Sequence, residues 1–211
     1  MRSSRPSSRN SSSDLAVREL VAQRAGREWC LFVDRDGVMN RRVVGDYVRN
    51  WEDFEWLSGA RLALVTLREW APHIVVVTNQ QGVGKGVMSA DDLAAIHQHI
   101  QSELAVDNVT IDAFQVCPHL ESAHCACRKP RPGLVLEWLR QNPRSEPSLS
   151  IMVGDSQSDL EAAVNIEAAV GGCSSVQIGR YVGVGGIADA CFDSLRDFAL
   201  AVARARAERD S

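Results

Sequence analysis

Short apolar runs rich in β-branched residues alternate along the chain with segments whose apolar residues recur at helical spacing. The runs predict strands at 30–33, 74–78, 114–117, 150–153 and 176–178, with a weaker sixth at 191–192. The helical segments span 60–70, 90–104, 134–141, 158–169 and 195–205, and Ser89 with Asp92 predicts a capping box before the second. Because strands and helices alternate, we expect an α/β fold built on a doubly wound, Rossmann-like parallel sheet.

Composition is that of a globular protein with one substantial core. Of 211 residues, 45% are hydrophobic and 24% are charged, and we expect one domain over residues 27–207. No apolar stretch approaches the roughly 20 residues that span a bilayer, so we expect no membrane partner. The net charge of -4 gives no general attraction to nucleic acid. We expect a cytoplasmic protein, with a monomer as the default state.

The first residues have the composition of a disordered segment. Residues 1–13 contain seven Ser and three Arg with no acidic residue, so they offer too little apolar surface to fold. We therefore expect residues 1–26 to form a disordered tail and leader. A transit peptide and an over-extended start are alternative explanations for this composition, but an acid follows at Asp14 and no apolar signal core is present.

Polar residues collect directly after the predicted strands, beginning with two aspartates after the first. Asp34 and Asp36 lie two positions apart before Gly37, so in extended backbone they point to the same side. One carboxylate suits nucleophilic attack and the other suits proton transfer. Their mutual repulsion favours a bound divalent metal. The alternative is an ordinary Asp-x-Asp-Gly turn without chemistry.

The second predicted strand ends in a run of hydrogen-bonding residues. Thr78, Asn79, Gln80 and Gln81 precede Gly82, and their hydroxyl, amides and freed backbone N–H groups suit an anion such as phosphate. The glycines that follow do not form a nucleotide-binding P-loop, because Asn79 replaces its first glycine and Gly86 its Ser/Thr. A strand-to-helix turn without a ligand is the alternative interpretation.

Three thiols and an imidazole follow the third predicted strand. The pairs Cys117/His119 and Cys125/Cys127 supply a tetrahedral set that suits Zn²⁺, and four protein ligands predict a structural role. A disulfide or free core cysteines fit less well in a chain without an export signal. His124 is a less suitable ligand than His119 because it adjoins Cys125.

Two cations and two more aspartates complete the pattern at the predicted sheet edge. Arg128 and Lys129 follow the zinc-binding loop directly and suit phosphate recognition, with a solvated basic turn as the alternative. Asp155 ends the fourth strand and is a candidate metal ligand. Asp159 lies one helical turn later, where it can orient Lys129 or cap the helix.

Together these motifs resemble the haloacid dehalogenase (HAD) superfamily of phosphohydrolases. The shared features are D-x-D-G-V after the first strand, a second strand ending in Thr, a Lys after the third and G-D-x-x-x-D after the fourth. The resemblance covers residues 28–199 and implies a HAD-like fold. No insertion is long enough for a large cap domain, and the zinc-binding loop is small.

Finer motifs place the chain near one branch of that superfamily. F-V-D-R-D-G-V-M-N, V-V-V-T-N-Q-Q-G-V and C-P-H…C-x-C-R-K-P are similar to the branch that contains heptose-bisphosphate and histidinol-phosphate phosphatases. Segments 45–57 and 128–133 favour removal of the 7-phosphate of heptose 1,7-bisphosphate in activated-heptose synthesis. The short zinc-binding loop favours histidinol phosphate, which is the alternative substrate. The chain departs from many heptose enzymes at Gln81 and Ser156.

The resemblance also implies a mechanism and a set of contacts. Asp34 forms an aspartyl phosphate, while Asp36 acts first as acid and then as base. Mg²⁺ would be held by Asp34, the Asp36 carbonyl and Asp155, with Thr78 and Lys129 stabilising the phosphoryl oxygens. The expected substrate contacts are Arg35, Asp46, Tyr47, Asn79, Gln80, Gln81 and Arg128, the last on the anomeric phosphate. A non-catalytic, zinc-stabilised binding module is the alternative from a different class.

Overall fold

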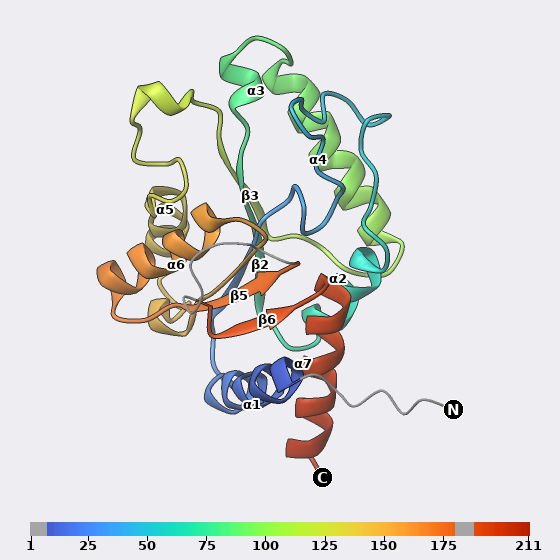
Figure 1. The fold of residues 1–211 in the computed structure, drawn as a ribbon, viewed down its shortest axis with the longest axis vertical. Coiled ribbons are helices and arrows are strands. Elements are labelled where there is room, and N and C mark those ends of the chain that lie inside the picture. Colours follow the sequence, from blue (N-terminus) through green and yellow to red (C-terminus); the bar gives the residue numbers. More distant parts are fainter. Residues whose placement is uncertain (1–7, 180–187) are drawn as a thin grey trace.

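A parallel sheet of six strands forms the centre of the protein, in the order β3-β2-β1-β4-β5-β6 (Figure 1). The computed structural model describes residues 8–179 and 188–211. The strands are β1 (Cys30–Val33), β2 (His73–Asn79), β3 (Ala113–Cys117), β4 (Ile151–Gly154), β5 (Ser174–Ile178) and β6 (Ala190–Phe192). All six predicted strands are therefore confirmed, with ends that differ by at most two residues.

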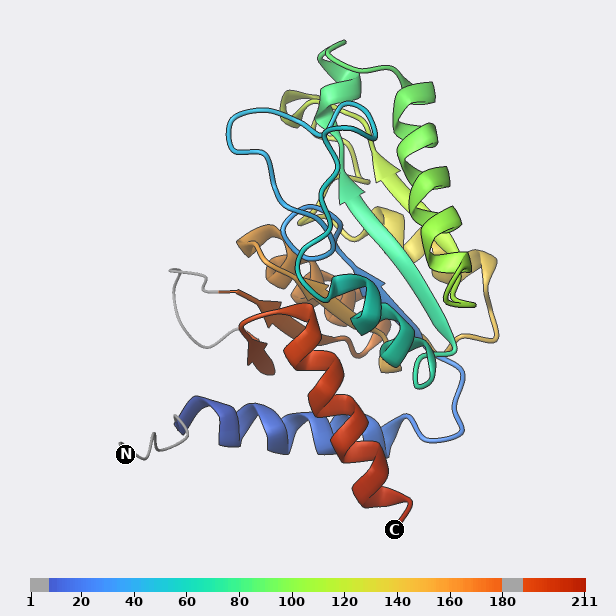
Figure 2. The ribbon, with the colours of Figure 1, turned by 90° about the vertical axis from the view of Figure 1, so that its right-hand side faces the viewer.

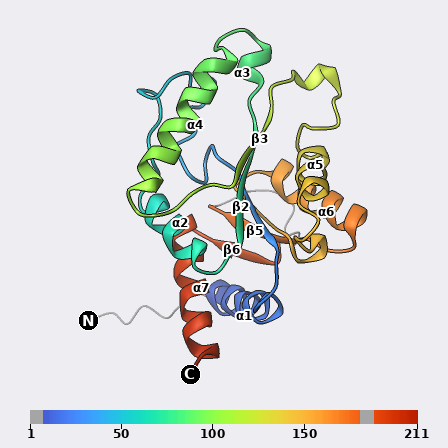
Figure 3. The same ribbon diagram turned by 180° about the vertical axis from the view of Figure 1, so that it is seen from behind.

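Helices cover both faces of this sheet, as the alternating pattern predicts. The sheet-covering helices are α2 (Ala60–Arg68), α4 (Ala90–Ala105), α5 (Gly133–Gln141), α6 (Gln157–Val170) and α7 (Leu195–Arg209). Helices α5 and α6 lie on one side of the sheet, and α2, α4 and α7 lie on the other (Figures 1 and 3). The predicted capping box between Ser89 and Asp92 is present at the start of α4.

Alternation along the central strand supplies the two hydrophobic cores. Leu31 and Val33 of β1 belong to the larger core under α2, α4 and α7, whereas Cys30 and Phe32 belong to the smaller core under α5 and α6. All four residues are fully buried. A strand buried on both faces reads as a continuous apolar run, and this is the reason why the sequence pattern identified it.

The predicted disordered leader is wrong for residues 8–23, which form helix α1 (Ser8–Gln23). Val17, Leu20 and Val21 lie on one face of this helix and are buried, and α1 crosses α7 near the end of the molecule that holds the C-terminus (Figure 2). Three apolar positions at helical spacing were too few to stand out beside the serine-rich start. Residues 1–7 of the predicted tail, and 180–187 within the predicted domain, lie outside the described residues.

The loops at the carboxyl ends of the strands gather at one end of the sheet (Figure 2). They include residues 34–59, the short helix α3 (Gln81–Gly84) and the 3₁₀ turn η1 (Glu121–Ala123), whereas the 3₁₀ turn η2 (Pro147–Leu149) precedes β4 at its amino end. Within the described ranges, the segments that follow β1 and β3 contain no separate folded cap, as the sequence predicts. None of the described helices is long and apolar enough to cross a membrane.

Candidate active site

Asp34 lies at the end of β1, where the strand pairing still fixes its backbone. Its N–H donates to the carbonyl of Val153 in β4 at 2.9 Å, which holds the residue at the edge of the sheet. The side chain is buried, and the Lys129 ammonium donates to its Oδ1 at 2.7 Å. Burial raises the pKa of Asp34 to about 7, although the Lys129 charge opposes this shift. The carboxyl group of Asp34 is thus largely removed from solvent and lies against the Lys129 ammonium.

Lys129 is held by three oxygen atoms. Besides Asp34, its ammonium lies 2.6 Å from Oδ1 of Asp159 and donates to the Val77 carbonyl at 2.7 Å. Burial opposes its charge, but Asp159 and Asp34 outweigh that effect, so the pKa of Lys129 lies above its usual value. Asp159 also completes the capping box of α6 with Ser156. Both predicted roles of Asp159, orienting Lys129 and capping the helix, therefore occur together.

Asp36 points toward a set of donors. Arg35 donates to both of its carboxylate oxygens at 2.9 Å, Asn40 donates to Oδ1 at 2.9 Å, and Gln80 donates to Oδ2 at 2.8 Å. Burial opposes ionisation of Asp36, but the Arg35 charge and these hydrogen bonds outweigh it, so the pKa of Asp36 lies below its usual range.

Two residues expected to contact substrate also donate hydrogen bonds to Asp36. Arg35 has no exposed surface, and within the described part of the chain its guanidinium pairs only with the Asp36 carboxylate. Gln80 is 2% exposed and bridges Asp36 to the Thr78 hydroxyl, where it donates at 2.8 Å. Arg35 thus holds the Asp36 carboxylate from a fully buried position, and its direct contact with substrate stays a prediction.

Oxygen atoms of Asp34, Asp36 and Asp155 lie around a single nitrogen atom of the Arg42 guanidinium. Nη2 of Arg42 donates to Oδ1 of Asp155 at 2.7 Å and to the Asp36 carbonyl at 3.1 Å, and it lies 4.0 Å from Oδ2 of Asp34. These are the oxygens expected to bind Mg²⁺. Carboxylate and carbonyl oxygens are its preferred protein ligands, so the set fits a magnesium ion.

Gly37 allows this convergence. Its φ of +94° lies in the left-handed region, and a Cβ at this position would stand 1.9 Å from Oδ2 of Asp155. The glycine of the D-x-D-G motif is thus required both by the turn and by the approach of Asp155.

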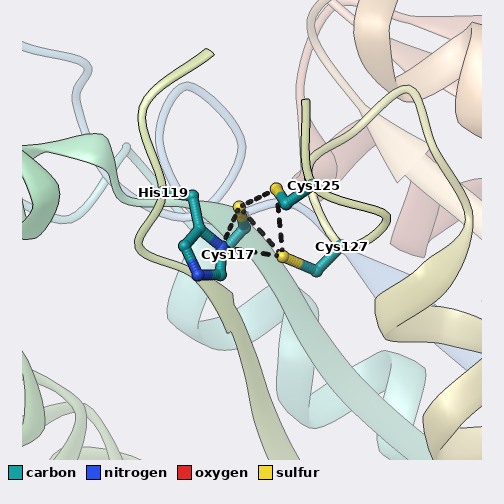
Figure 4. Close-up of side chains that lie close together, drawn as sticks. All are labelled: Cys117, His119, Cys125 and Cys127. Atoms are coloured by element: carbon teal, nitrogen blue, oxygen red, sulfur yellow. Dashed lines mark hydrogen bonds between the residues drawn. The ribbon is translucent and has the colours of Figure 1, made fainter. Parts of the chain in front are cut away.

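The four predicted zinc ligands form one cluster (Figure 4). The sulfur atoms of Cys117, Cys125 and Cys127 lie 3.3–3.5 Å apart, and Nδ1 of His119 lies 3.1 Å from the Cys127 sulfur and 3.8 Å from the Cys117 sulfur. Tetrahedral zinc ligands at about 2.0–2.3 Å from the metal are separated by roughly 3.5 Å, so the cluster fits Zn²⁺. His124 is exposed and is not part of the cluster, in agreement with the preference for His119.

A cavity of about 290 Å³ opens beside Asp34. The predicted residues that line it are Asp34, Arg35, Asp36, Asp46, Tyr47, Thr78, Asn79, Gln80, Gln81 and Lys129. Asn79 also exchanges two hydrogen bonds with the Lys129 backbone, both at 3.1 Å. Arg128 is half-buried and is not among the lining residues, although its Nη1 finds no hydrogen-bond partner within the described part of the chain.

Sequence reasoning missed several residues of the site. Arg42, Val43, Val48 and Ser158 also line the cavity, together with Ser156, which the sequence marked only as a departure. Asn40 was missed as a donor to Asp36. Arg42 and Asn40 lie in a loop rather than at a strand end, so position relative to the strands gave no signal for them.

Comparison with known proteins places this site in a known context. Residues 31–168 match a family model described as polynucleotide kinase 3 phosphatase. D-glycero-α-D-manno-heptose-1,7-bisphosphate 7-phosphatase of Mycobacterium bovis is 67% identical over 190 residues, which cover 90% of this chain and all of the relative. The β-anomer 7-phosphatase of Rhodopseudomonas palustris is 36% identical over 146 residues, covering 66% of this chain and 79% of the relative.

A solved structure agrees with these sequence matches. The D,D-heptose 1,7-bisphosphate phosphatase of B. bronchiseptica, complexed with magnesium and phosphate, superposes with a TM-score of 0.72 at 26% identity. The match covers 87% of this chain and 99% of that one.

The fold and the aspartate-lysine site define a phosphatase of the HAD superfamily, a phosphoric monoester hydrolase. Within that superfamily, the chain belongs to the family of D-glycero-D-manno-heptose-1,7-bisphosphate 7-phosphatases.

Proposed function

We propose that the chain removes the 7-phosphate of D-glycero-D-manno-heptose 1,7-bisphosphate, using Mg²⁺ and an aspartyl-phosphate intermediate, in the synthesis of activated heptose. The observation that carries the proposal is the buried Asp34 carboxylate beside the cavity, 2.7 Å from the Lys129 ammonium. A carboxylate beside a buried cation suits phosphoryl transfer through a covalent intermediate, because the cation stabilises the charge on the phosphoryl oxygens.

In the first half-reaction, Asp34 attacks phosphorus and displaces the sugar oxygen. The Lys129 ammonium lies beside the attacking carboxylate, where it stabilises negative charge on the phosphoryl oxygens. The Thr78 hydroxyl accepts from Gln80, which leaves its own proton free to donate to the same oxygens. When bound between Asp34, the Asp36 carbonyl and Asp155, Mg²⁺ would neutralise the repulsion between nucleophile and phosphate.

Asp36 transfers protons in both half-reactions. The donors Arg35, Asn40 and Gln80 stabilise its ionised form, which is the form that activates water to hydrolyse the aspartyl phosphate. To act first as an acid, Asp36 must hold a proton, and the approach of a negatively charged phosphate raises the pKa of a neighbouring carboxyl group. The substrate itself thus favours the protonated form at the step that needs it.

The proposed zinc site acts indirectly. Lys129 is two residues beyond Cys127, the last ligand of the cluster, so a Zn²⁺ ion held there would fix the loop that delivers the catalytic ammonium. This structural role needs no open coordination position. A structural role also agrees with the absence of the four cluster residues from the lining of the cavity.

The α anomer is our preferred substrate. The relative that is 67% identical is named for the α anomer, whereas the β-anomer relative is 36% identical. Histidinol phosphate was favoured only by the length of the zinc-binding loop, and the curated relatives named above are heptose enzymes. We propose that the substrate is a small phosphorylated sugar and that the reaction takes place in the cytoplasm.

Phosphate release with Mg²⁺ tests the proposal directly. The substrates are both anomers of heptose 1,7-bisphosphate, histidinol phosphate and a 3′-phosphorylated oligonucleotide, the last because of the family-model match. We expect the α anomer to be hydrolysed with the highest kcat/KM. Asp34→Asn should abolish turnover and keep the fold, while Asp91→Asn, on the exposed start of α4, should match the wild type. Preference for histidinol phosphate or the oligonucleotide would contradict the proposal, and no release from any substrate would favour a binding module.

Arg128 offers a second test, of the anomeric phosphate. Its Nη1, which finds no partner within the described part of the chain, supports a contact between this guanidinium and an anion. Arg128→Ala should lower kcat/KM on the bisphosphate much more than on heptose 7-phosphate. Equal losses on the two substrates would contradict the assignment of Arg128 to the anomeric phosphate.

A further inference from the structure

The Arg42 guanidinium lies where the three oxygens of the proposed magnesium site converge. Nη2 contacts Oδ1 of Asp155 at 2.7 Å and the Asp36 carbonyl at 3.1 Å, and it is 4.0 Å from Oδ2 of Asp34. A single nitrogen thus faces one oxygen from each of the three expected metal ligands. No other arginine or lysine is recorded in contact with Asp155 in the described part of the chain.

A divalent cation and this nitrogen cannot share these oxygens. Mg²⁺ binds oxygen at about 2.0–2.1 Å, which leaves no room for a hydrogen bond from a guanidinium to the same atoms. The two positive charges would also repel at short range. A guanidinium group stays positively charged in proteins, so loss of a proton does not remove the conflict. The side chain must therefore move when the cation binds.

Arg42 is placed so that it can move. Its side chain is 47% exposed, whereas those of Asp34 and Asp155 are 7% and 19% exposed. It lies in the loop between β1 and α2, outside any helix or strand, so its movement breaks no backbone hydrogen bond of the sheet. The aspartates, by contrast, are fixed at the ends of β1 and β4.

We propose that Arg42 competes with the catalytic divalent cation for Asp34, Asp36 and Asp155, and so sets the affinity of the site for metal. Arg42 holds the three oxygens together in the metal-free protein, and the cation displaces it on binding. The apparent affinity for metal then equals the intrinsic affinity multiplied by the fraction of metal-free molecules in which Arg42 does not contact these oxygens. The inference rests on the metal site of the proposed function but not on its substrate.

Direct binding of Mn²⁺ to the whole chain tests this inference without any activity measurement. Free Mn²⁺ is measured by electron paramagnetic resonance during titration of zinc-loaded protein. Arg42→Gln keeps much of the side-chain stem and removes the charge, so we expect it to bind Mn²⁺ roughly fivefold or more tightly than the wild type. Arg42→Ala provides the same measurement if the first variant does not fold.

Two control variants identify the site and the effect of charge. Arg41→Gln removes a neighbouring exposed charge that pairs with Glu55 and does not line the cavity, and it should leave the Mn²⁺ affinity unchanged. Asp155→Asn should abolish the binding that Arg42→Gln strengthens. Equal or weaker binding by both Arg42 variants would overturn the role of Arg42 alone. Absence of binding to the wild type would overturn the metal site of the proposed function as well.

Discussion

The side chain of Asn79 holds the backbone of Lys129 from two directions. Nδ2 of Asn79 donates to the Lys129 carbonyl and Oδ1 accepts from the Lys129 N–H, both at 3.1 Å. The end of β2 is thereby joined to the loop that follows the zinc cluster. Asn79 was expected to contact substrate, and these contacts assign it a positioning role besides its place in the cavity lining.

Replacement of Asn79 should therefore disturb Lys129 as well as substrate binding. Asn79→Ala removes the two hydrogen bonds to the Lys129 backbone, and we expect kcat to fall at least about tenfold. A tenfold loss corresponds to about 1.4 kcal/mol of transition-state stabilisation. Steady-state kinetics measures the effect. Asn165→Ala is the matched control, since Asn165 donates to the neighbouring Pro130 carbonyl from the exposed side, and its kcat should remain at the wild-type value. A rise in KM alone for Asn79→Ala would indicate substrate contact without positioning.

Arg35 should act on catalysis only through Asp36. Arg35→Met fills a similar volume but removes the charge that holds the Asp36 carboxylate, so the pKa of Asp36 rises. In the proposed mechanism, hydrolysis of the aspartyl phosphate needs ionised Asp36, and Asp34 no longer titrates once it carries the phosphoryl group. The acidic limb of the hydrolysis rate against pH should therefore move to higher pH in Arg35→Met.

The pH profile separates this role from a purely structural one. A uniform loss of activity at every pH would show that Arg35 supports only the fold. Arg41→Met, which changes the adjacent exposed arginine of the loop, should leave the profile unchanged.

The sequence predicts those parts of the candidate site in which the polar or cysteine residues lie at the carboxyl end of a strand. Asp34, Thr78, Cys117 and Asp155 each lie in or directly after a strand, and parallel strands bring their carboxyl ends to one edge. The periodic pattern therefore predicted both the sheet and the convergence of these residues. The clustering of Cys117, His119, Cys125 and Cys127 was predictable from their spacing alone.

Other contacts depend on how the loops fold back, which short-range patterns do not encode. Arg42 reaches Asp155 across 113 positions of sequence, and no property of its own segment indicates this contact. The complete burial of Arg35 is equally hidden, because an arginine beside a catalytic aspartate is ordinarily expected to face solvent or substrate. Helix α1 was missed because its apolar face is narrow and meets α7 at the other end of the chain.

Loss of one zinc ligand should affect both stability and activity. Cys127 lies 3.3 Å from the sulfur atoms of Cys117 and Cys125, so Cys127→Ser removes a central thiolate from the proposed set. We expect bound zinc, measured by elemental analysis, to fall from one ion per chain toward none. The thermal midpoint should fall by at least about 6 °C, corresponding to about 2 kcal/mol for a domain of this size.

The same change should lower turnover, because Lys129 follows the cluster directly. Cys191→Ser, on the edge strand β6 and away from the cluster, should retain zinc and activity. Retention of zinc by Cys127→Ser would contradict the predicted ligand set.

His97 should make stability depend on pH although it takes no part in the proposed mechanism. The imidazole is buried and stacks on Phe114, with ring centroids 4.2 Å apart. Burial, followed by the nearby Arg35 charge, lowers the pKa of His97 to about 3 from the ordinary value of 6.5. The unfolded chain therefore binds a proton below about pH 6.5, while the folded protein does not, and stability falls as the pH decreases from 6.5 toward 3.

The size of this effect follows from the two pKa values. Between pH 7.5 and 5.5 we expect the free energy of unfolding to fall by about 1 kcal/mol through His97. His97→Phe keeps the stack on Phe114 and removes the titration, so its loss of stability over this range should be smaller than that of the wild type by the same amount. Urea unfolding at the two pH values measures both. His99→Phe, a change on the same helix at a more exposed histidine that stacks on Trp51, is the matched control and should retain the wild-type dependence. Equal pH dependence in the wild type and His97→Phe would mean that His97 is protonated in the folded protein or that the unfolded chain does not protonate it.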